Sequence, residues 1–134
     1  MKQEIIGYDF DGVIFEQHHE GWFGKLMWKI FPRTTSYITH SFAKKRMIFM
    51  IPDSYIITGR PGVTEEKLTR RQMREWGLDA KLFIDMSKDK PNRKSSIDWK
   101  VENINLLGIT RFYEDDDETI KVLRKLTKAE IIKV

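Results

Sequence analysis

The sequence predicts an α/β fold, a Rossmann-like doubly wound parallel sheet with a short, mainly helical insertion after the first strand. Apolar runs that fit buried strands alternate with segments that fit helices. Glycine or proline ends several of these elements. The chain of 134 residues is 40% hydrophobic and 33% charged, which suits one globular domain with a real core. We therefore expect a single domain over residues 1–134, with residues 16–50 inserted into it.

The first predicted strand begins at Ile5 and delivers two carboxylates, Asp9 and Asp11, into a turn at Gly12. Because alternate residues of a strand face the same side, both acids are expected at one edge of the sheet. Carboxylates held close together repel each other and lose hydration, so they usually bind a cation or share a proton. A hard divalent ion such as Mg²⁺ suits them. The alternative is a solvated loop with two unrelated acids.

The insertion, residues 16–50, is basic and rich in aromatic residues. Pro32 ends its first part, and a second helix is predicted from Thr34 or Thr35 through Met47. No acidic residue occurs between Glu20 and Asp53. The insertion is thus predicted to be a lid over the acidic strand end, the alternative being packing residues with a solvated basic face. Its basic residues are Lys25, Lys29, Arg33, Lys44, Lys45 and Arg46.

The rest of the chain continues the alternation of strands and helices. Thr64 and Ser96 are predicted helix caps, and Gly77 and Gly108 are predicted helix ends. The predicted strands are 54–58, 81–86, 109–113 and 129–134, and the predicted helices are 64–76, 97–107 and 118–127.

Polar side chains gather at the carboxyl ends of three predicted strands. Asp9 and Asp11 follow the first strand, Thr58 ends the second, and the acidic run 114–117 follows the fourth. Ligand sites of open α/β sheets lie outside these strand ends. A helix N-cap with an acidic first turn explains Asp117 and Glu118. It explains the acids of 114–116 less readily, and so these are predicted to bind a metal ion together with the first strand.

These segments resemble motifs of the haloacid dehalogenase (HAD) superfamily of phosphatases. Asp9-Phe10-Asp11-Gly12-Val13 is similar to the first motif, Ile56-Ile57-Thr58-Gly59-Arg60 to the second, and Phe112-Tyr113-Glu114-Asp115-Asp116 to the fourth. Ser96-Ile97-Asp98-Trp99-Lys100 resembles the helix start that carries the lysine of the third, with Lys94 and Lys90 as rival lysines. The insertion occupies the position of the family's cap module, although it is shorter than a full cap domain.

The resemblance implies a Mg²⁺-dependent phosphomonoester hydrolase. Asp9 would attack phosphorus and form an aspartyl-phosphate, while Asp11 would protonate the leaving group and then activate water. Thr58, Gly59 and Lys100 would bind the phosphate oxygens.

The same resemblance implies the metal ligands. Asp9, the backbone carbonyl of Asp11, and Asp115 would hold Mg²⁺. Asp116 or Glu114 would be an outer ligand, and the sequence does not decide which acid of 114–116 binds directly.

Two other classes share part of this pattern. A receiver domain of a signalling relay also combines acids, Thr, Lys and Mg²⁺, but its acidic pair and acceptor come in another order. A phosphate- or nucleic-acid-binding module would use the basic insertion and leave the aligned strand ends unexplained. A phosphatase assay with and without Mg²⁺ distinguishes these readings.

Composition narrows the setting of the protein. There is no cysteine, which excludes disulfides and thiolate chemistry. The net charge of +4 favours an anionic partner, such as a nucleotide, another phosphorylated small molecule or a nucleic-acid end. Because no apolar run is long enough to span a membrane and the first strand follows the amino terminus directly, we expect a cytoplasmic protein without membrane association. The sequence indicates neither the substrate nor the oligomeric state.

Overall fold

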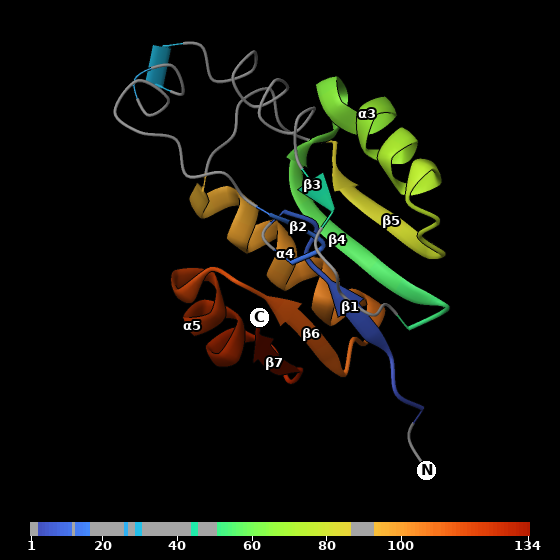
Figure 1. Cartoon of the computed structure of the whole chain (residues 1–134). Coiled ribbons are helices and arrows are strands. Elements are labelled where there is room, and N and C mark those ends of the chain that lie inside the picture. Colours follow the sequence, from blue (N-terminus) through green and yellow to red (C-terminus); the bar gives the residue numbers. More distant parts are fainter. Residues whose placement is uncertain are drawn as a thin grey trace.

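The computed structural model describes residues 3–11, 13–16, 26, 29–30, 44–45, 51–86 and 93–134. Its centre is a five-stranded sheet in which every neighbouring pair is parallel, in the order β5-β4-β1-β6-β7 (Figure 1). The strands are β1 (Ile6–Tyr8), β4 (Ser54–Pro61), β5 (Ala80–Asp85), β6 (Arg111–Glu114) and β7 (Glu130–Lys133). The parallel α/β fold that the sequence predicts is confirmed.

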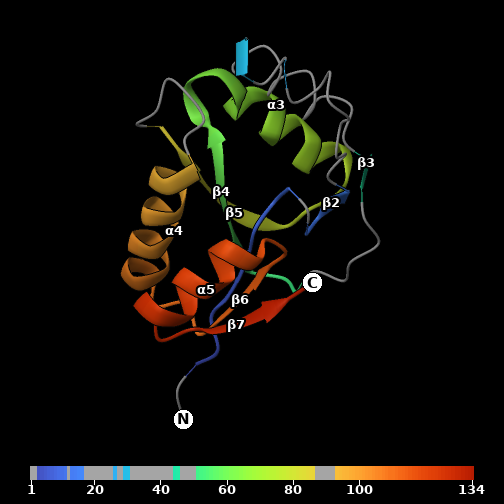
Figure 2. The same cartoon turned by 90° about the vertical axis from the view of Figure 1, so that its left-hand side faces the viewer.

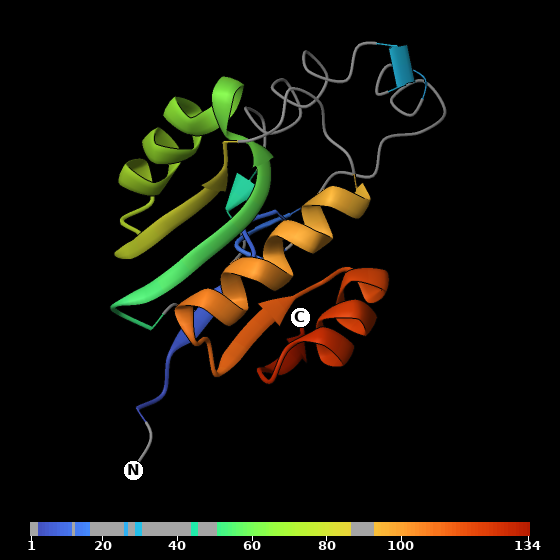
Figure 3. The same ribbon diagram turned by 180° about the vertical axis from the view of Figure 1, so that it is seen from behind.

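In the described part of the chain, three helices cover the two faces of the sheet. They are α3 (Gly62–Glu75), α4 (Arg93–Leu107) and α5 (Asp117–Leu126). Figure 2 shows α3 on one face and α4 and α5 on the other, and Figure 3 shows α4 crossing the sheet on the face that it shares with α5. This double winding follows from right-handed connections that leave the centre of the sheet in both directions.

The core lies on both sides of the central strands. All three residues of β1 are buried, and Tyr8 stacks on Tyr113 of β6 with ring centroids 4.9 Å apart. Phe112 of β6 fits against β1 because residue 7 is glycine. A Cβ atom at Gly7 would lie 2.8 Å from the Phe112 ring, closer than carbon atoms approach without displacement.

Several helix starts differ from the sequence prediction. Helix α3 begins directly after Pro61, and Thr64 is not its cap but lies in the first turn, where its hydroxyl donates to the Pro61 carbonyl. Helix α4 begins at Arg93, three residues before Ser96, so Ser96 is not its cap either. Strand β4 also runs past Thr58 to Pro61, with an irregular register against β5. The chain therefore passes from β4 to α3 without the break that was predicted between the strand end at Thr58 and the helix start at Thr64.

The helix ends agree with the sequence. Gly77 and Gly108 both adopt positive φ, 63° and 64°, just beyond α3 and α4. Glycine takes this conformation without the steric cost that a Cβ atom imposes, and it commonly ends helices in this way.

Only a few residues of the insertion are described. Within 16–50, Lys44–Lys45 form strand β3, which pairs antiparallel with β2 (Phe15–Glu16). The predicted second helix is therefore wrong at these two lysines, because their backbone groups pair across strands. The remaining helical character and the lid role fall largely on residues outside the described part of the chain.

The path of the chain identifies the point where a ligand is expected. After β1 the sheet grows through β4 to β5, and α4 then carries the chain back across to β6 and β7. Strands β1 and β6 therefore flank the topological switch point, outside which open α/β sheets bind their ligands. No helix in the described part of the chain combines the length and hydropathy needed to cross a membrane.

Candidate metal and phosphate site

A buried lysine and two buried carboxylates meet at the switch point. Asp9 follows β1, Glu114 ends β6, and Lys100 comes from α4. The Lys100 Nζ atom donates to Glu114 Oε2 at 2.9 Å and lies 3.2 Å from Asp9 Oδ1. Glu114 is 1% exposed and Asp9 6% exposed, so water screens this cluster little.

Asp115 completes a group of three carboxylates. Asp9, Glu114 and Asp115 each offer an oxygen, and these oxygens lie within 4.8 Å of one another. Together with one ammonium group, three ionised carboxylates would leave two negative charges in a largely buried site. Hard carboxylate oxygens at this separation are the donors that Mg²⁺ and Ca²⁺ prefer. The residues therefore fit a divalent cation.

The pKa shifts reflect the burial of these carboxyl groups and, after it, their mutual repulsion. Burial raises the pKa of Asp9 well above its usual range, and neighbouring Glu114 adds to that effect. Burial and Glu114 also raise the pKa of Asp115, to about 7. Without a metal ion, the site thus limits its charge by keeping protons on carboxyl groups, which a divalent cation would displace.

Lys100 and Glu114 are the stably charged pair of the cluster. Burial alone would lower the pKa of Lys100, but the carboxylates of Asp9 and Glu114 outweigh it and raise this pKa above its ordinary value. Burial works in the opposite direction on Glu114, and its contact with Lys100 nevertheless holds the pKa of Glu114 below the usual value.

Backbone groups fix the orientation of the carboxylates. The amide of Phe10 donates to Asp9 Oδ1 at 2.8 Å. The amides of Asp115 and Asp116 donate to Glu114 Oε1 at 3.1 and 3.4 Å. These bonds come from the turns that leave β1 and β6, so the strand ends themselves position the acids.

Asp116 has a structural role that the resemblance does not imply. Its Oδ2 atom accepts hydrogen bonds from the amide and hydroxyl of Thr119, at 2.9 and 2.7 Å, and so Asp116 is the N-cap of α5. The sequence placed that cap at Asp117 and predicted Asp116 as a metal residue. Among the described residues, Glu114 is the acid that joins Asp9 and Asp115.

The predicted phosphate-binding residues lie at the same edge of the sheet. Thr58 is buried, and its hydroxyl accepts a hydrogen bond from the amide of Arg60 at 3.2 Å. At Gly59, a Cβ atom would lie 3.0 Å from Ser96 on α4, so a larger residue does not fit without a shift. The rival lysines are not compared with Lys100, because Lys90 and the side chain of Lys94 lie outside the described residues.

Asp11 is paired with an arginine to which the sequence analysis assigned no role. Arg60 Nε donates to Asp11 Oδ2 at 2.9 Å, and Arg60 Nη2 donates to Asp11 Oδ1 at 2.7 Å. The two oxygens of Asp11 thus meet a fork of two donors, the geometry in which arginine binds carboxylates most strongly. A cation at the end of a buried strand, beside two predicted acids, was the available signal for this pair.

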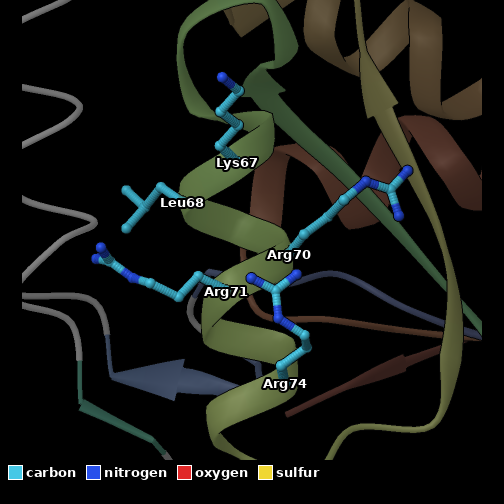
Figure 4. Close-up of a pocket in the computed structure, with 5 residues that line it drawn as sticks. All are labelled: Lys67, Leu68, Arg70, Arg71 and Arg74. Atoms are coloured by element: carbon cyan, nitrogen blue, oxygen red, sulfur yellow. The ribbon is translucent and has the colours of Figure 1, made fainter.

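A second feature lies on the outer face of α3. A hollow of about 340 Å³ is lined by Lys67, Leu68, Arg70, Arg71 and Arg74 (Figure 4). Arg70 and Arg71 form ion pairs with acids four residues away on the same helix. The face is nevertheless basic overall, which suits an anionic partner.

The site thus consists of Asp9, Glu114, Asp115 and Lys100 at the switch point. Asp11 lies beside them in its pair with Arg60. The resemblance to HAD phosphatases stays a prediction. Comparisons of the chain with family models, curated proteins and solved structures gave no match.

Proposed function

We propose that this protein is a Mg²⁺-dependent phosphomonoester hydrolase of the HAD type that works through an aspartyl-phosphate on Asp9. The observation that carries the proposal is the cluster at the switch point, where Lys100 Nζ lies 3.2 Å from Asp9 beside Glu114 and Asp115. A structural ion pair alone does not require a third carboxylate there. A phosphoryl-transfer site requires both a cation and a nucleophile at this edge.

The metal is assigned to the carboxylates that stand together. Asp9, Glu114 and Asp115 would hold Mg²⁺, and the donor chemistry fits it. When bound, the ion neutralises negative charge between a carboxylate nucleophile and a phosphate.

The protein's own groups account for the two steps. In the first, a carboxylate oxygen of Asp9 bonds to phosphorus and the bond from phosphorus to the alcohol oxygen breaks, with the proton supplied by Asp11. In the second, a water oxygen attacks phosphorus and gives its proton to Asp11, the bond to Asp9 breaks, and inorganic phosphate leaves.

Lys100 has a donor for the phosphate. An ammonium group has three N–H donors, and two of those of Lys100 are directed at Glu114 and Asp9. We assign the third to a non-bridging phosphate oxygen, together with the hydroxyl of Thr58 and the backbone at Gly59. Such contacts stabilise charge in the transition state.

The order of the strands favours this function over a receiver domain. Taken in chain order, the five strands of the sheet are arranged 3-2-1-4-5, as in Rossmann folds. Receiver domains have the flavodoxin-like order 2-1-3-4-5. A module that binds phosphate without turnover is the remaining alternative, and the assay described below separates it from the hydrolase.

The substrate we propose is a nucleotide or the phosphorylated end of a nucleic acid. The basic face of α3 supports it, because this helix begins directly after β4, the strand that carries Thr58 and Arg60. Phosphates beyond the reacting one would meet Lys67 and Arg74, for which the described residues provide no ion-pair partner.

Phosphatase turnover is the direct test. Purified protein should release inorganic phosphate from aryl phosphates and phosphorylated oligonucleotides with Mg²⁺, and excess chelator should abolish the release. Asp9→Asn should also abolish the release, and Asp117→Asn is its matched control. Asp117 is an exposed acid that pairs with Lys133 and is not assigned to the site. Turnover that continues in chelator removes the metal from the mechanism. Tight phosphate binding without turnover identifies the binding module.

The salt dependence of the Michaelis constant tests the substrate class. Replacing Lys67 and Arg74 by Ala should raise the Michaelis constant for a phosphorylated oligonucleotide and flatten its salt dependence. Replacing Lys121 and Lys125 on α5 by Ala removes the same charge elsewhere. This change should leave the Michaelis constant and its salt dependence unchanged. Equal effects of the two double variants reject the assignment of the α3 face.

A further inference from the structure

A buried arginine beside the site has no part in the chemistry described so far. The side chain of Arg60 is 0% exposed, whereas that of its partner Asp11 is 17% exposed. An arginine is costly to bury unless its donors are satisfied. The partners of Arg60 therefore indicate what it does.

The guanidinium group is held from three sides. Its Nη1 atom donates to Thr69 Oγ1 at 3.0 Å and to Gln72 Oε1 at 2.7 Å, both on α3. Its Cζ atom lies 4.4 Å from the ring centroid of Phe10, within the range of a cation–π contact. Arg60 is thus fixed to the scaffold, and two further donors, one on Nε and one on Nη2, meet the two oxygens of Asp11.

We infer that Arg60 is a positioning residue that orients Asp11 to receive the proton of the attacking water. This inference rests on the proposed function. A carboxylate has about four lone-pair sites, and the arginine fork occupies two of them on one edge. The Asp11 side chain is also 17% exposed, so solvent reaches the carboxylate while it stays paired with Arg60.

The step is balanced with these groups alone. The water oxygen forms a bond to phosphorus as the bond from phosphorus to the Asp9 oxygen breaks, and Asp9 recovers its carboxylate. The water proton goes to Asp11, which keeps it as the acid for the leaving group of the next turnover. Arg60 supplies orientation and touches neither water nor phosphate.

A burst experiment isolates this step. With 4-nitrophenyl phosphate the leaving group departs without help from an acid, so formation of the aspartyl-phosphate does not depend on Asp11. Arg60→Met should keep a burst of one nitrophenol per enzyme and lower the steady-state rate by about 100-fold, the cost of a misplaced catalytic group. Arg60→Lys keeps the charge but loses the fork, so its steady-state rate should lie between those of the wild type and Arg60→Met.

Two further variants make the test specific. In an Asp11→Asn background, Arg60→Met should lower the steady-state rate by no more than about 2-fold, because the two residues act as a unit. Arg111→Met is the matched control, since it removes an arginine paired with Glu4 and Glu130 at the amino-terminal end of β6, and it should leave burst and steady state unchanged.

Three results would overturn the inference. They are an unchanged steady-state rate in Arg60→Met, loss of the burst together with the steady state in folded protein, and full additivity with Asp11→Asn. If Arg60→Met does not fold, Thr69→Val removes only one bond to Nη1 and should show the same defect on a smaller scale. An unchanged rate there rejects the inference equally.

If the proposed function itself is wrong, the results differ from those that would overturn the role of Arg60. In that case the wild type forms no phosphoenzyme, and the pairing of Arg60 with Asp11 is tested by urea unfolding of the single and double variants. Midpoint shifts that are less than additive support positioning of Asp11 by Arg60, and additive shifts refute it.

Discussion

Replacing Lys100 by Met should destabilise the protein without metal by about 4 kcal/mol at pH 7. The change removes the ammonium that lies 2.9 Å from Glu114 and 3.2 Å from Asp9 but keeps much of the side chain's volume. Glu114, left in a buried site, can then avoid an unpaired charge by taking up a proton. From an ordinary pKa of about 4.3, protonation at pH 7 costs about 2.7 × 1.36, or about 3.7 kcal/mol.

This reasoning also fixes the pH dependence of the loss. At pH 5 the same protonation costs only about 1 kcal/mol, so the difference between the variant and the wild type should shrink about fourfold. In the variant the pKa of Glu114 would lie above its unfolded value. The contribution of Glu114 to the stability of the variant is therefore greatest at low pH and decreases as pH rises from about 4.

Urea unfolding measures the effect, in chelator and again in saturating Mg²⁺. The ion would hold the same carboxylates, so it should restore most of the lost stability. Lys133→Met is the control, because Lys133 forms an exposed pair with Asp117, and exposed pairs contribute about 0.2–1 kcal/mol. Equal losses in the two variants, or a loss for Lys100→Met that depends on neither pH nor Mg²⁺, would refute the account of the cluster.

Three further predictions concern single acids. Asp9→Asn should lower turnover by several orders of magnitude and abolish the acid-stable phosphoenzyme that chemical quench detects, while near-normal rates would refute its assignment as nucleophile. Calorimetry should find that Mg²⁺ binds more tightly as pH rises to about 7, because Asp115 and Asp9 lose protons on binding, and Asp115→Asn should remove much of that dependence. Asp116→Ala should cost about 1 kcal/mol of stability through loss of the α5 cap, with little effect on Mg²⁺ affinity, whereas Glu114→Gln should weaken Mg²⁺ binding strongly. The opposite ranking in the two assays would exchange the roles of Asp116 and Glu114.

The fold could be predicted because its signals are local. The apolar run of β1 and the alternation of strands with helices are properties of short stretches of sequence. The helix starts were placed less well, since Thr64 and Ser96 are good caps by residue type. Helix α3 instead follows β4 without a loop, and α4 begins before its expected cap.

The site could be predicted in part for the same reason. Asp9 and the acidic run stand at strand ends, and topology brings strand ends together. The choice between Glu114 and Asp116 could not be made from the pattern, because positions 114 and 116 share one phase of the strand alternation, and only the structure shows that β6 ends at Glu114. The pair of Arg60 with Asp11 joins residues 49 positions apart, and the sequence indicates it only through the position of Arg60 at a strand end, near two predicted acids.

The glycine at position 7 affects how far apart the carboxylate oxygens of the proposed metal site lie. Neighbouring strands are about 4.8 Å apart, a distance that one cation can bridge between two carboxylates. Strand β6 reaches this spacing beside β1 because the Phe112 ring occupies the space where a methyl group at residue 7 would be, and the Asp9 amide closes the ladder by donating to the Tyr113 carbonyl at 3.0 Å. The width of a charged site is thus set by an apolar contact two residues before it. Even an alanine at residue 7, though it carries no charge and touches no ligand, would widen the gap that the ion has to span.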